Sequence, residues 1–252
     1  MNMLTPEQWE PLTISFLIIL FRVGAVVSLL PAIGEASIPV RVKLAMAICL
    51  TLVIFPIVPD KSAINFIDSA AFFVVISEIS VGLWFGLLLR VFVFCLQTAG
   101  AIAAQATSLS QILGTAGVEP LPAMGHVIAM AGLTLALSLG LHVSAAHYLV
   151  GSYVLFPIGQ MPDISNLVET AVTQIAWGFR LAFTLASPFF ILSLLYNLTL
   201  GVINRAMPQL MVAFVGAPVI TAGALFMLAV AIPLMLRTWS EALFGFVATG
   251  VL

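Results

Sequence analysis

Charged residues are scarce in this chain. Lysine, arginine, aspartate and glutamate make up only 7% of its 252 residues, whereas hydrophobic residues make up 62%. Because soluble domains carry about 25% charged residues, this composition excludes a soluble globular protein. Apolar stretches of about 18 residues or more recur along the chain, and such stretches are long enough to cross a bilayer. The composition therefore predicts an integral membrane protein.

Cysteine is nearly absent as well. Cys49 and Cys95 lie in separate apolar stretches, which excludes a disulfide framework. His126, His142 and His147 are not joined by a cysteine or an acidic residue at metal-ligand spacing. No nucleophile elbow, phosphate-binding loop or dinucleotide fingerprint is present, and a net charge of −2 leaves no basic surface for nucleic acid. We expect no catalytic residue, no metal and no cofactor.

The alternation of apolar and polar residues that marks a membrane β-barrel is also missing. Helices are then the only structure that can span the bilayer, so we expect an all-α membrane protein. Turns rich in proline, glycine and charge separate six hydrophobic segments. The expected helices cover residues 11–30, 42–57, 70–104, 124–156, 170–204 and 209–248.

The third, fifth and sixth segments exceed the roughly 20 residues that a crossing requires, so they must tilt, kink or protrude. Pro188, Pro218 and Pro233 offer kink sites, because proline lacks the amide hydrogen of the helical ladder. Residues 82–86 read GLWFG, a spacing of small residues that favours close helix–helix contact. No linker divides the chain, so we expect one domain over residues 1–252.

The lysine and arginine residues of the short loops predict the orientation in the membrane. Arg41, Lys43 and Arg205 fall on one side, and Lys61 and Arg237 fall on the other side with most of the acidic residues. Because the cytoplasmic side carries the excess of basic residues, this bias of three to two favours termini outside the cytoplasm and a cytoplasmic turn around Arg205.

Four charged residues lie inside the apolar segments, where each needs a polar partner: Arg22, Glu78, Arg90 and Arg180. Glu78 and Arg90 are twelve residues apart on one helix, about 18 Å by helical rise, so they cannot pair with each other. Two interpretations stay open. The charges either form a proton or ion path, or they pair across helix–helix contacts and extend to lipid headgroups.

The end of the third segment carries a small, polar face. Gln97, Ala101, Gln105 and Ser108 follow one another at i, i+4, i+8 and i+11, so they share one face of a helix. Such a face is unsuited to lipid and suits a water-filled conduit or a polar interface. We therefore treat Gln97 and Gln105 as candidates for pore-facing residues.

A glycine-bearing loop follows that face. It contains Gly114 and Gly117 and ends in Glu119 and Pro120. Irregular backbone at membrane depth persists only where it is buried in protein or lines a cavity. An ordinary surface loop is the alternative, and composition does not separate the two.

Near the C-terminus, residues 200–219 read LGVINRAMPQLMVAFVGAPV. Asn204, Arg205, Pro208 and Gln209 interrupt two long apolar stretches at turn spacing. The pattern predicts a tight polar turn between two membrane-length helices.

Three stretches together resemble the FliR family, the export-gate subunit of flagellar type III secretion, whose injectisome relatives are called SctT. They are SIPVRVKLAMAICLTLVI at residues 37–54, SLSQILGTAGVEP at 108–120, and the stretch at 200–219. The Asn-Arg-x-x-Pro-Gln turn is the most specific element. Glu119 departs from the aspartate expected before the proline, but it keeps the charge.

The resemblance implies a non-enzymatic pore subunit. Residues 1–168 would form a FliP-like portion and residues 169–252 a FliQ-like hairpin. The chain would join FliP-like and FliQ-like subunits, and an FlhB-like subunit would bind the complex. The pore would pass unfolded flagellar subunits across the bacterial inner membrane. The chain would also contact the lipid of that membrane.

The resemblance also implies roles for particular residues. The loop at about 106–122 would plug the closed pore; the residues concerned are Ser108, Gln111, Gly114, Gly117, Glu119 and Pro120. The turn residues Asn204, Arg205, Pro208 and Gln209 would contact neighbouring turns or the FlhB-like subunit. An injectisome SctT-type subunit stays an alternative. So does a small ion or solute transporter, which would explain Glu78, although no internal repeat supports it.

Overall fold

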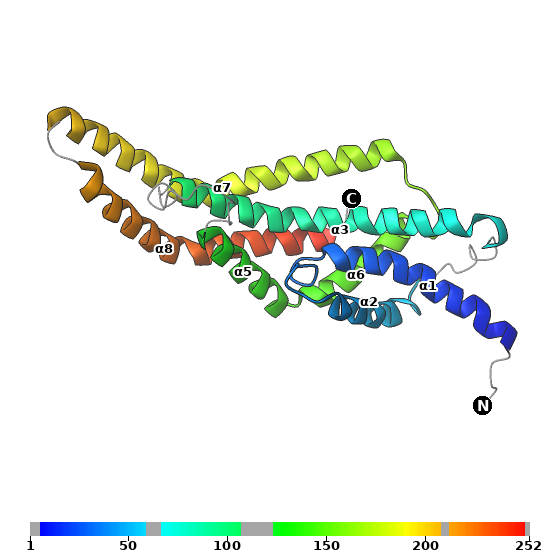
Figure 1. The fold of residues 1–252 in the computed structure, drawn as a ribbon. Coiled ribbons are helices and arrows are strands. Elements are labelled where there is room, and N and C mark those ends of the chain that lie inside the picture. Colours follow the sequence, from blue (N-terminus) through cyan, green and yellow to red (C-terminus); the bar gives the residue numbers. More distant parts are fainter. Residues whose placement is uncertain (1–5, 59–66, 107–122, 208–211, 250–252) are drawn as a thin grey trace. The chain divides into compact units, whose positions relative to one another are not determined.

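The structure, a computed structural model, describes residues 6–58, 67–106, 123–207 and 212–249. Within these ranges the chain consists of helices joined by short turns, with no strand, as Figure 1 shows. The all-α prediction is therefore confirmed. The helices are α1 (Pro6–Leu29), α2 (Val40–Ile54), α3 (Ile67–Ala106), α5 (Ala123–Ser138), α6 (Leu141–Leu155), α7 (Ile164–Ala206) and α8 (Val212–Thr249).

The prediction of a single helix over 124–156 is wrong. The chain leaves the helical conformation after Ser138 and starts α6 at Leu141. Gly140 has φ +88°, a left-handed conformation that side chains resist and glycine adopts freely. Its amide donates to the carbonyl of Leu137 at 3.1 Å, which closes the end of α5. The sequence reads as one apolar stretch because glycine inside a membrane helix does not by itself mark a break.

Within the described ranges, four helices are long and apolar enough to cross a membrane. Their apolar spans are Leu12–Leu29, Phe72–Ala106, Ile164–Ala206 and Pro218–Thr249. A fifth span is present if α5 and α6 together count as one broken crossing. Pro188, Pro218 and Pro233 all lie inside α7 and α8, and the helical assignment continues through each of them.

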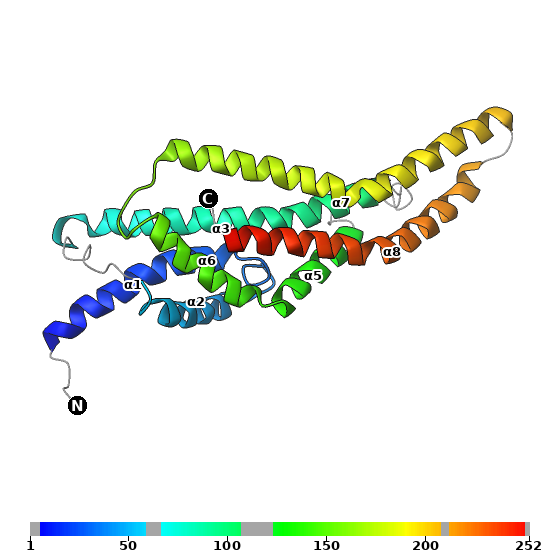
Figure 2. The same ribbon diagram turned by 180° about the vertical axis from the view of Figure 1, so that it is seen from behind.

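The described chain divides into two units, and the first comprises residues 1–91, 137–174 and 243–252. Here α2 packs against α1 and α6, which Figure 2 shows from behind. The rings of Phe16 and Phe55 meet with centroids 6.0 Å apart. Gly82 and Gly86 of α3 lie directly against α1. A Cβ at Gly82 would stand 2.5 Å from the carbonyl oxygen of Arg22, so the close contact expected from GLWFG is present.

The second unit comprises residues 92–136 and 175–242. The end of α3 crosses α5 at two glycines, Gly100 and Gly125, with no room for a Cβ on Gly100. The buried indole of Trp239 on α8 donates from Nε1 to the carbonyl of Phe92 at 2.9 Å. α7 and α8 run as the two arms of a hairpin, and Gly223 of α8 faces Leu192 of α7.

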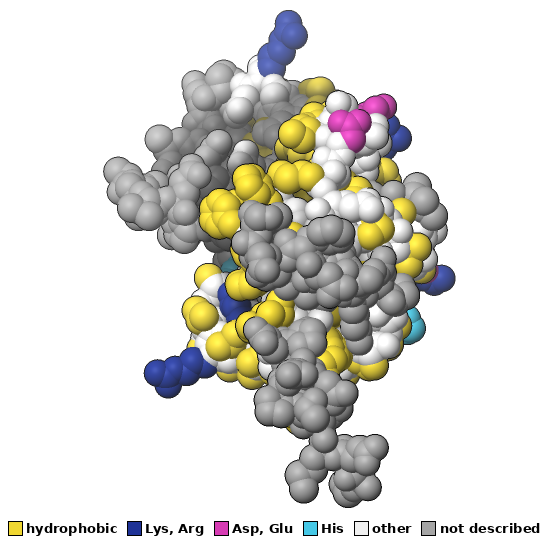
Figure 3. All heavy atoms as spheres, turned by 90° about the vertical axis from the view of Figure 1, so that its right-hand side faces the viewer, with side chains coloured by type: hydrophobic (Ala, Val, Ile, Leu, Met, Phe, Trp, Pro, Cys, Tyr) yellow, Lys and Arg dark blue, Asp and Glu magenta, His cyan; other side chains and the backbone are white. Residues whose placement is uncertain are grey.

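Large apolar side chains cover much of the surface. Figure 3 shows one side of the molecule, on which hydrophobic side chains are exposed and only a few charged groups project between them. The helices differ in how much of them the chain itself buries. In the span of α3, 56% of the residues are buried, against 22% in the spans of α7 and α8. The hairpin helices therefore present surface that lipid or another protein must cover.

Candidate functional site

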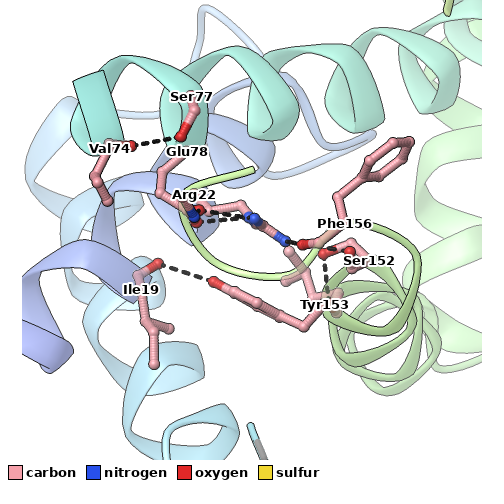
Figure 4. Close-up of polar contacts among 10 residues, drawn as sticks. Ile19, Arg22, Val74, Ser77, Glu78, Ser152, Tyr153 and Phe156 are labelled. Atoms are coloured by element: carbon pink, nitrogen blue, oxygen red, sulfur yellow. Dashed lines mark hydrogen bonds and ion pairs between the residues drawn. The ribbon is translucent and has the colours of Figure 1, made fainter. Parts of the chain in front are cut away.

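Two of the charged residues predicted to lie inside the membrane form a buried ion pair. Arg22 of α1 and Glu78 of α3 both have side chains that are 0% exposed. The guanidinium donates from Nε to Oε2 at 2.7 Å and from Nη2 to Oε1 at 2.8 Å, as Figure 4 shows. This two-point geometry is the strong form of an arginine–carboxylate pair.

The guanidinium of Arg22 also caps α6. Its Nη1 donates to the carbonyls of Phe156 at 2.8 Å and Ser152 at 3.2 Å. These carbonyls lie at the C-terminal end of α6, where the helix dipole is negative. The carbonyl of Ser152 also accepts from the amide of Phe156 at 2.9 Å. The ring of Tyr153 lies 4.0 Å from the guanidinium carbon and adds a cation–π contact. Arg22 therefore connects α1 and α3 to the end of α6.

The carboxylate of Glu78 has a further partner in the turn after α6. The amide of Gly159 donates to Oε1 at 3.1 Å. Gly159 has φ +78°, a conformation in which a side chain would be strained. With the two bonds from Arg22, the carboxylate accepts three hydrogen bonds, and its oxygens are directed at fixed donors.

This arrangement bears on the two interpretations left open for the intramembrane charges. A proton or ion path requires a carboxylate that can exchange its partners. Glu78 is held by a neutralising cation and by a backbone amide, both buried. Removing one partner from such a pair costs about 3–5 kcal/mol, because an uncompensated charge stays buried. The geometry supports structural pairing.

The third intramembrane charge, Arg90, pairs with a loop residue. Its guanidinium donates to Glu35 at 2.6 Å and 3.2 Å, and both side chains are mostly buried. Glu35 belongs to the loop between α1 and α2. Lys43, from the Ile-Pro-x-Arg-x-Lys stretch, donates to the carbonyl of Gly34 in the same loop at 3.0 Å. Two basic side chains thus hold this loop against the helices.

The remaining predicted residues are dispersed. Gln97 is half-buried on α3, whereas Gln105 is exposed. Asn204 and Arg205 are exposed in the last turn of α7, and Arg180 is exposed near the middle of that helix. Several predicted residues lie outside the described ranges: Ser108, Gln111, Gly114, Gly117, Glu119, Pro120, Pro208 and Gln209.

The described residues include no group of three or more histidine, cysteine, aspartate or glutamate side chains that could hold a metal ion. His126, His142 and His147 are all exposed.

Sequence reasoning missed several partners of the buried charges. No pattern in the sequence singles out Glu35, Tyr153 or Gly159 as a partner of these charges. Ser152 and Phe156 contribute backbone carbonyls, which every residue carries, so no sequence pattern marks them. The pairing of Glu35 with Arg90 could have been considered, because both are lone charges beside apolar stretches.

Comparison with known proteins places the chain in a family. Residues 13–245 match the family model described as "Bacterial export proteins, family 1". The flagellar biosynthetic protein FliR of Caulobacter vibrioides is 32% identical over 227 residues, which are 87% of this chain and 89% of that protein. FliR of Escherichia coli is 29% identical over 237 residues, which are 93% of this chain and 90% of that protein. FliR of Bacillus subtilis is 27% identical over 227 residues, 86% and 85% of the two chains.

These relatives are flagellar proteins, and the match extends over nearly the whole chain. The four membrane-length apolar helices among the described residues are consistent with that family. The chain therefore belongs to the FliR family of bacterial export proteins and is a component of the flagellar export apparatus.

Proposed function

We propose that the chain is a core subunit of the flagellar protein export gate. With FliP-like and FliQ-like subunits it forms a pore in the inner membrane, and unfolded flagellar subunits pass through that pore. The match to FliR proteins along most of the chain carries this proposal. An FlhB-like subunit binds the assembled complex. The chain contributes structure and a gate, and it has no catalytic role.

The uncovered hairpin supports a role inside an assembly. Only 22% of the residues in the spans of α7 and α8 are buried by the chain itself. We propose that residues 169–252 act as a FliQ-like hairpin that packs beside FliQ-like subunits, and that residues 1–168 replace one FliP-like subunit. In the assembled complex, neighbouring subunits replace lipid around the hairpin, so the exposed surfaces of α7 and α8 form helix–helix contacts.

We further propose two gate elements. The segment at 106–122 closes the pore, with Gly114 and Gly117 allowing it to change conformation, and Gln97 and Gln105 line the neighbouring conduit. The turn of Asn204, Arg205, Pro208 and Gln209 meets partner subunits on the cytoplasmic side. The exposure of Asn204 and Arg205 at the end of α7 leaves them free for such contacts. Both termini lie on the periplasmic side in this arrangement.

The test is co-expression with FliP-like and FliQ-like subunits, followed by native mass measurement of the purified complex. A single large hetero-assembly that contains this chain is expected. A monomer or a small symmetric oligomer of this chain, unchanged by the partners, would contradict the proposal and favour the small-solute transporter.

The gate is tested separately by deleting residues 114–117. The closed and open states then differ less in free energy, so the closed population falls while the complex still forms. We expect dye or ion leakage across the membrane of cells that express the deletion with its partners. An intact complex without added leakage would show that the segment has no gating role.

A further inference from the structure

Arg180 is a cation that has no partner within the part of the chain that the structure describes. It lies on α7, and its side chain is exposed. Among the described residues, no hydrogen bond or ion pair reaches its guanidinium. By contrast, Arg22 and Arg90 pair with carboxylates inside the chain, and Arg237 pairs with Glu241 on its own helix.

The surface around Arg180 combines this charge with uncovered aromatic rings. Phe179 and Phe183 are 57% and 63% exposed. Thr184 and Ser187 follow Arg180 at i+4 and i+7, so the three share one face of α7. The two hydroxyls donate to the carbonyls of Arg180 and Thr184 within the helix, so they require nothing from a partner. The guanidinium is the unsatisfied group of this surface, which we call the Arg180 face.

Lipid alone does not suit the Arg180 face. Exposed apolar side chains continue along α7 on both sides of Arg180, with Ile175 and Phe179 before it and Phe183 and Phe190 after it. Hydroxyl side chains also share this face, but their hydrogen bonds stay within the helix and leave the charge unpaired. An arginine inside a membrane-spanning helix almost always faces protein or a water-filled cavity instead of lipid.

We propose that the Arg180 face docks a membrane helix of a partner subunit that carries a carboxylate opposite Arg180. The inference rests on the proposed function, since it assumes that the chain works inside a hetero-assembly. A carboxylate matches the planar guanidinium with two parallel hydrogen bonds and neutralises its charge when the interface is dry. Arg22 and Glu78 show this pairing inside the same chain. Phe179 and Phe183 surround the pair and exclude water, an arrangement typical of the central residues of an interface.

The first test compares Arg180→Glu with Arg237→Glu in cells that also express the partner subunits. Arg237 is a matched control because it is exposed and its partner Glu241 belongs to the same helix. We expect Arg180→Glu to lower the yield of complex by roughly thirtyfold or more, because that is the effect of losing one partner of a buried charge pair. Arg237→Glu should leave the yield unchanged. Equal yields for wild type and Arg180→Glu would overturn the inference.

Two further measurements separate the alternatives. The variant Arg180→Gln removes the charge without reversing it, and it should show a smaller loss of complex. Arg180→Glu and Arg180→Gln should each melt like the wild-type chain when purified alone, since Arg180 has no partner among the described residues. A lower melting temperature would assign Arg180 to folding and overturn the inference.

A charge exchange then identifies the partner. Each carboxylate within the membrane helices of the partner subunits is changed to arginine in the presence of Arg180→Glu. Recovery of the complex by one such change is expected. If none recovers it and the wild-type chain retains anionic lipid that Arg180→Glu loses, a lipid phosphate is the ligand and the inference is wrong. If the wild-type chain forms no complex at all, the proposed function fails; if only the dependence on Arg180 is missing, the proposed function stands.

Discussion

The region around Arg22 and the hairpin around Arg180 each contain an arginine, but the two side chains differ in burial and in their partners. The side chain of Arg22 is fully buried, and it forms four hydrogen bonds and a ring contact within the chain. Arg180 is exposed and has no such partner among the described residues. The first region therefore completes its polar contacts when the chain folds. In the second region, we propose that a partner subunit completes the contacts of Arg180.

The same contrast holds for apolar surface. Over half of the α3 span is buried, but less than a quarter of the α7 and α8 spans is. The chain thus buries one set of helices in its own fold and leaves another set uncovered, and we propose that partner subunits cover the second set. Substitutions in the two regions should separate the stability of the chain from its ability to assemble.

The largest expected effect comes from breaking the pair of Arg22 and Glu78. Glu78→Ala should lower the free energy of unfolding by about 3–5 kcal/mol, because Arg22 would stay buried without its counter-charge. The measurement is the thermal or denaturant unfolding of the purified chain in detergent. Glu241→Ala is the control, since its pair with Arg237 is exposed and should contribute little.

An exchange of the two charges sharpens this prediction. Arg22→Glu combined with Glu78→Arg keeps an ion pair, yet it should not restore stability. A glutamate at 22 cannot donate to the carbonyls of Ser152 and Phe156, and an arginine at 78 cannot accept from the amide of Gly159. Full recovery would show that only the Coulomb attraction matters at this site.

A smaller effect is expected for the partly exposed pair of Arg90 and Glu35. Glu35→Gln should reduce the free energy of unfolding by about 1.5–3 kcal/mol, the usual contribution of hydrogen bonds to a charged group. Glu35→Asp should recover part of the loss. Unchanged unfolding in both variants would mean that the loop between α1 and α2 is held by other contacts, such as that of Lys43 with Gly34.

The two glycines where α3 crosses α5 allow a matched pair of substitutions. Their effect on the free energy of unfolding should be comparable to that of the Glu35 variants or smaller. A Cβ on Gly100 would collide with Cα of Gly125, whereas a Cβ on Gly125 would find its nearest neighbour at 3.5 Å, an ordinary contact. Gly100→Ala should therefore destabilise the chain by about 1–3 kcal/mol through overpacking. Gly125→Ala should be neutral or slightly stabilising, because alanine favours the helix. Equal effects from the two changes would contradict the crossing geometry.

The smallest effect on the isolated chain is expected for Phe190, the exposed member of two adjacent phenylalanines on α7. Phe189 is 0% exposed and Phe190 is 58% exposed. Phe190→Ala should change the free energy of unfolding by less than about 0.5 kcal/mol, as surface substitutions do. It should nevertheless weaken assembly with partner subunits, measured by native mass of the complex. Phe189→Ala should cost about 3–5 kcal/mol in the chain alone.

Much of the fold could be predicted because its signals are local. Apolar stretches of membrane length predicted the helices now seen as α1, α2, α3, α7 and α8, with boundary errors of up to six residues. Scarcity of charge identified the membrane class. The spacing of Gly82 and Gly86 indicated a close contact, and the structure shows one with α1. These properties depend on neighbouring residues, so one sequence suffices to recognise them.

What the sequence alone determined is therefore the membrane class, the helical content, most helix positions and the family resemblance, since composition, run length and motifs carry them. The tertiary structure decided the rest. Arg22 meets Glu78 across 56 residues and the end of α6 across 130 or more, and such pairings depend on which helix faces pack together. The break at Gly140 depends on a single backbone dihedral that an apolar stretch does not reveal. Only the folded chain shows that Arg22, Glu78 and Arg90 have partners within it while Arg180 lacks one among the described residues, because exposure is a property of packing.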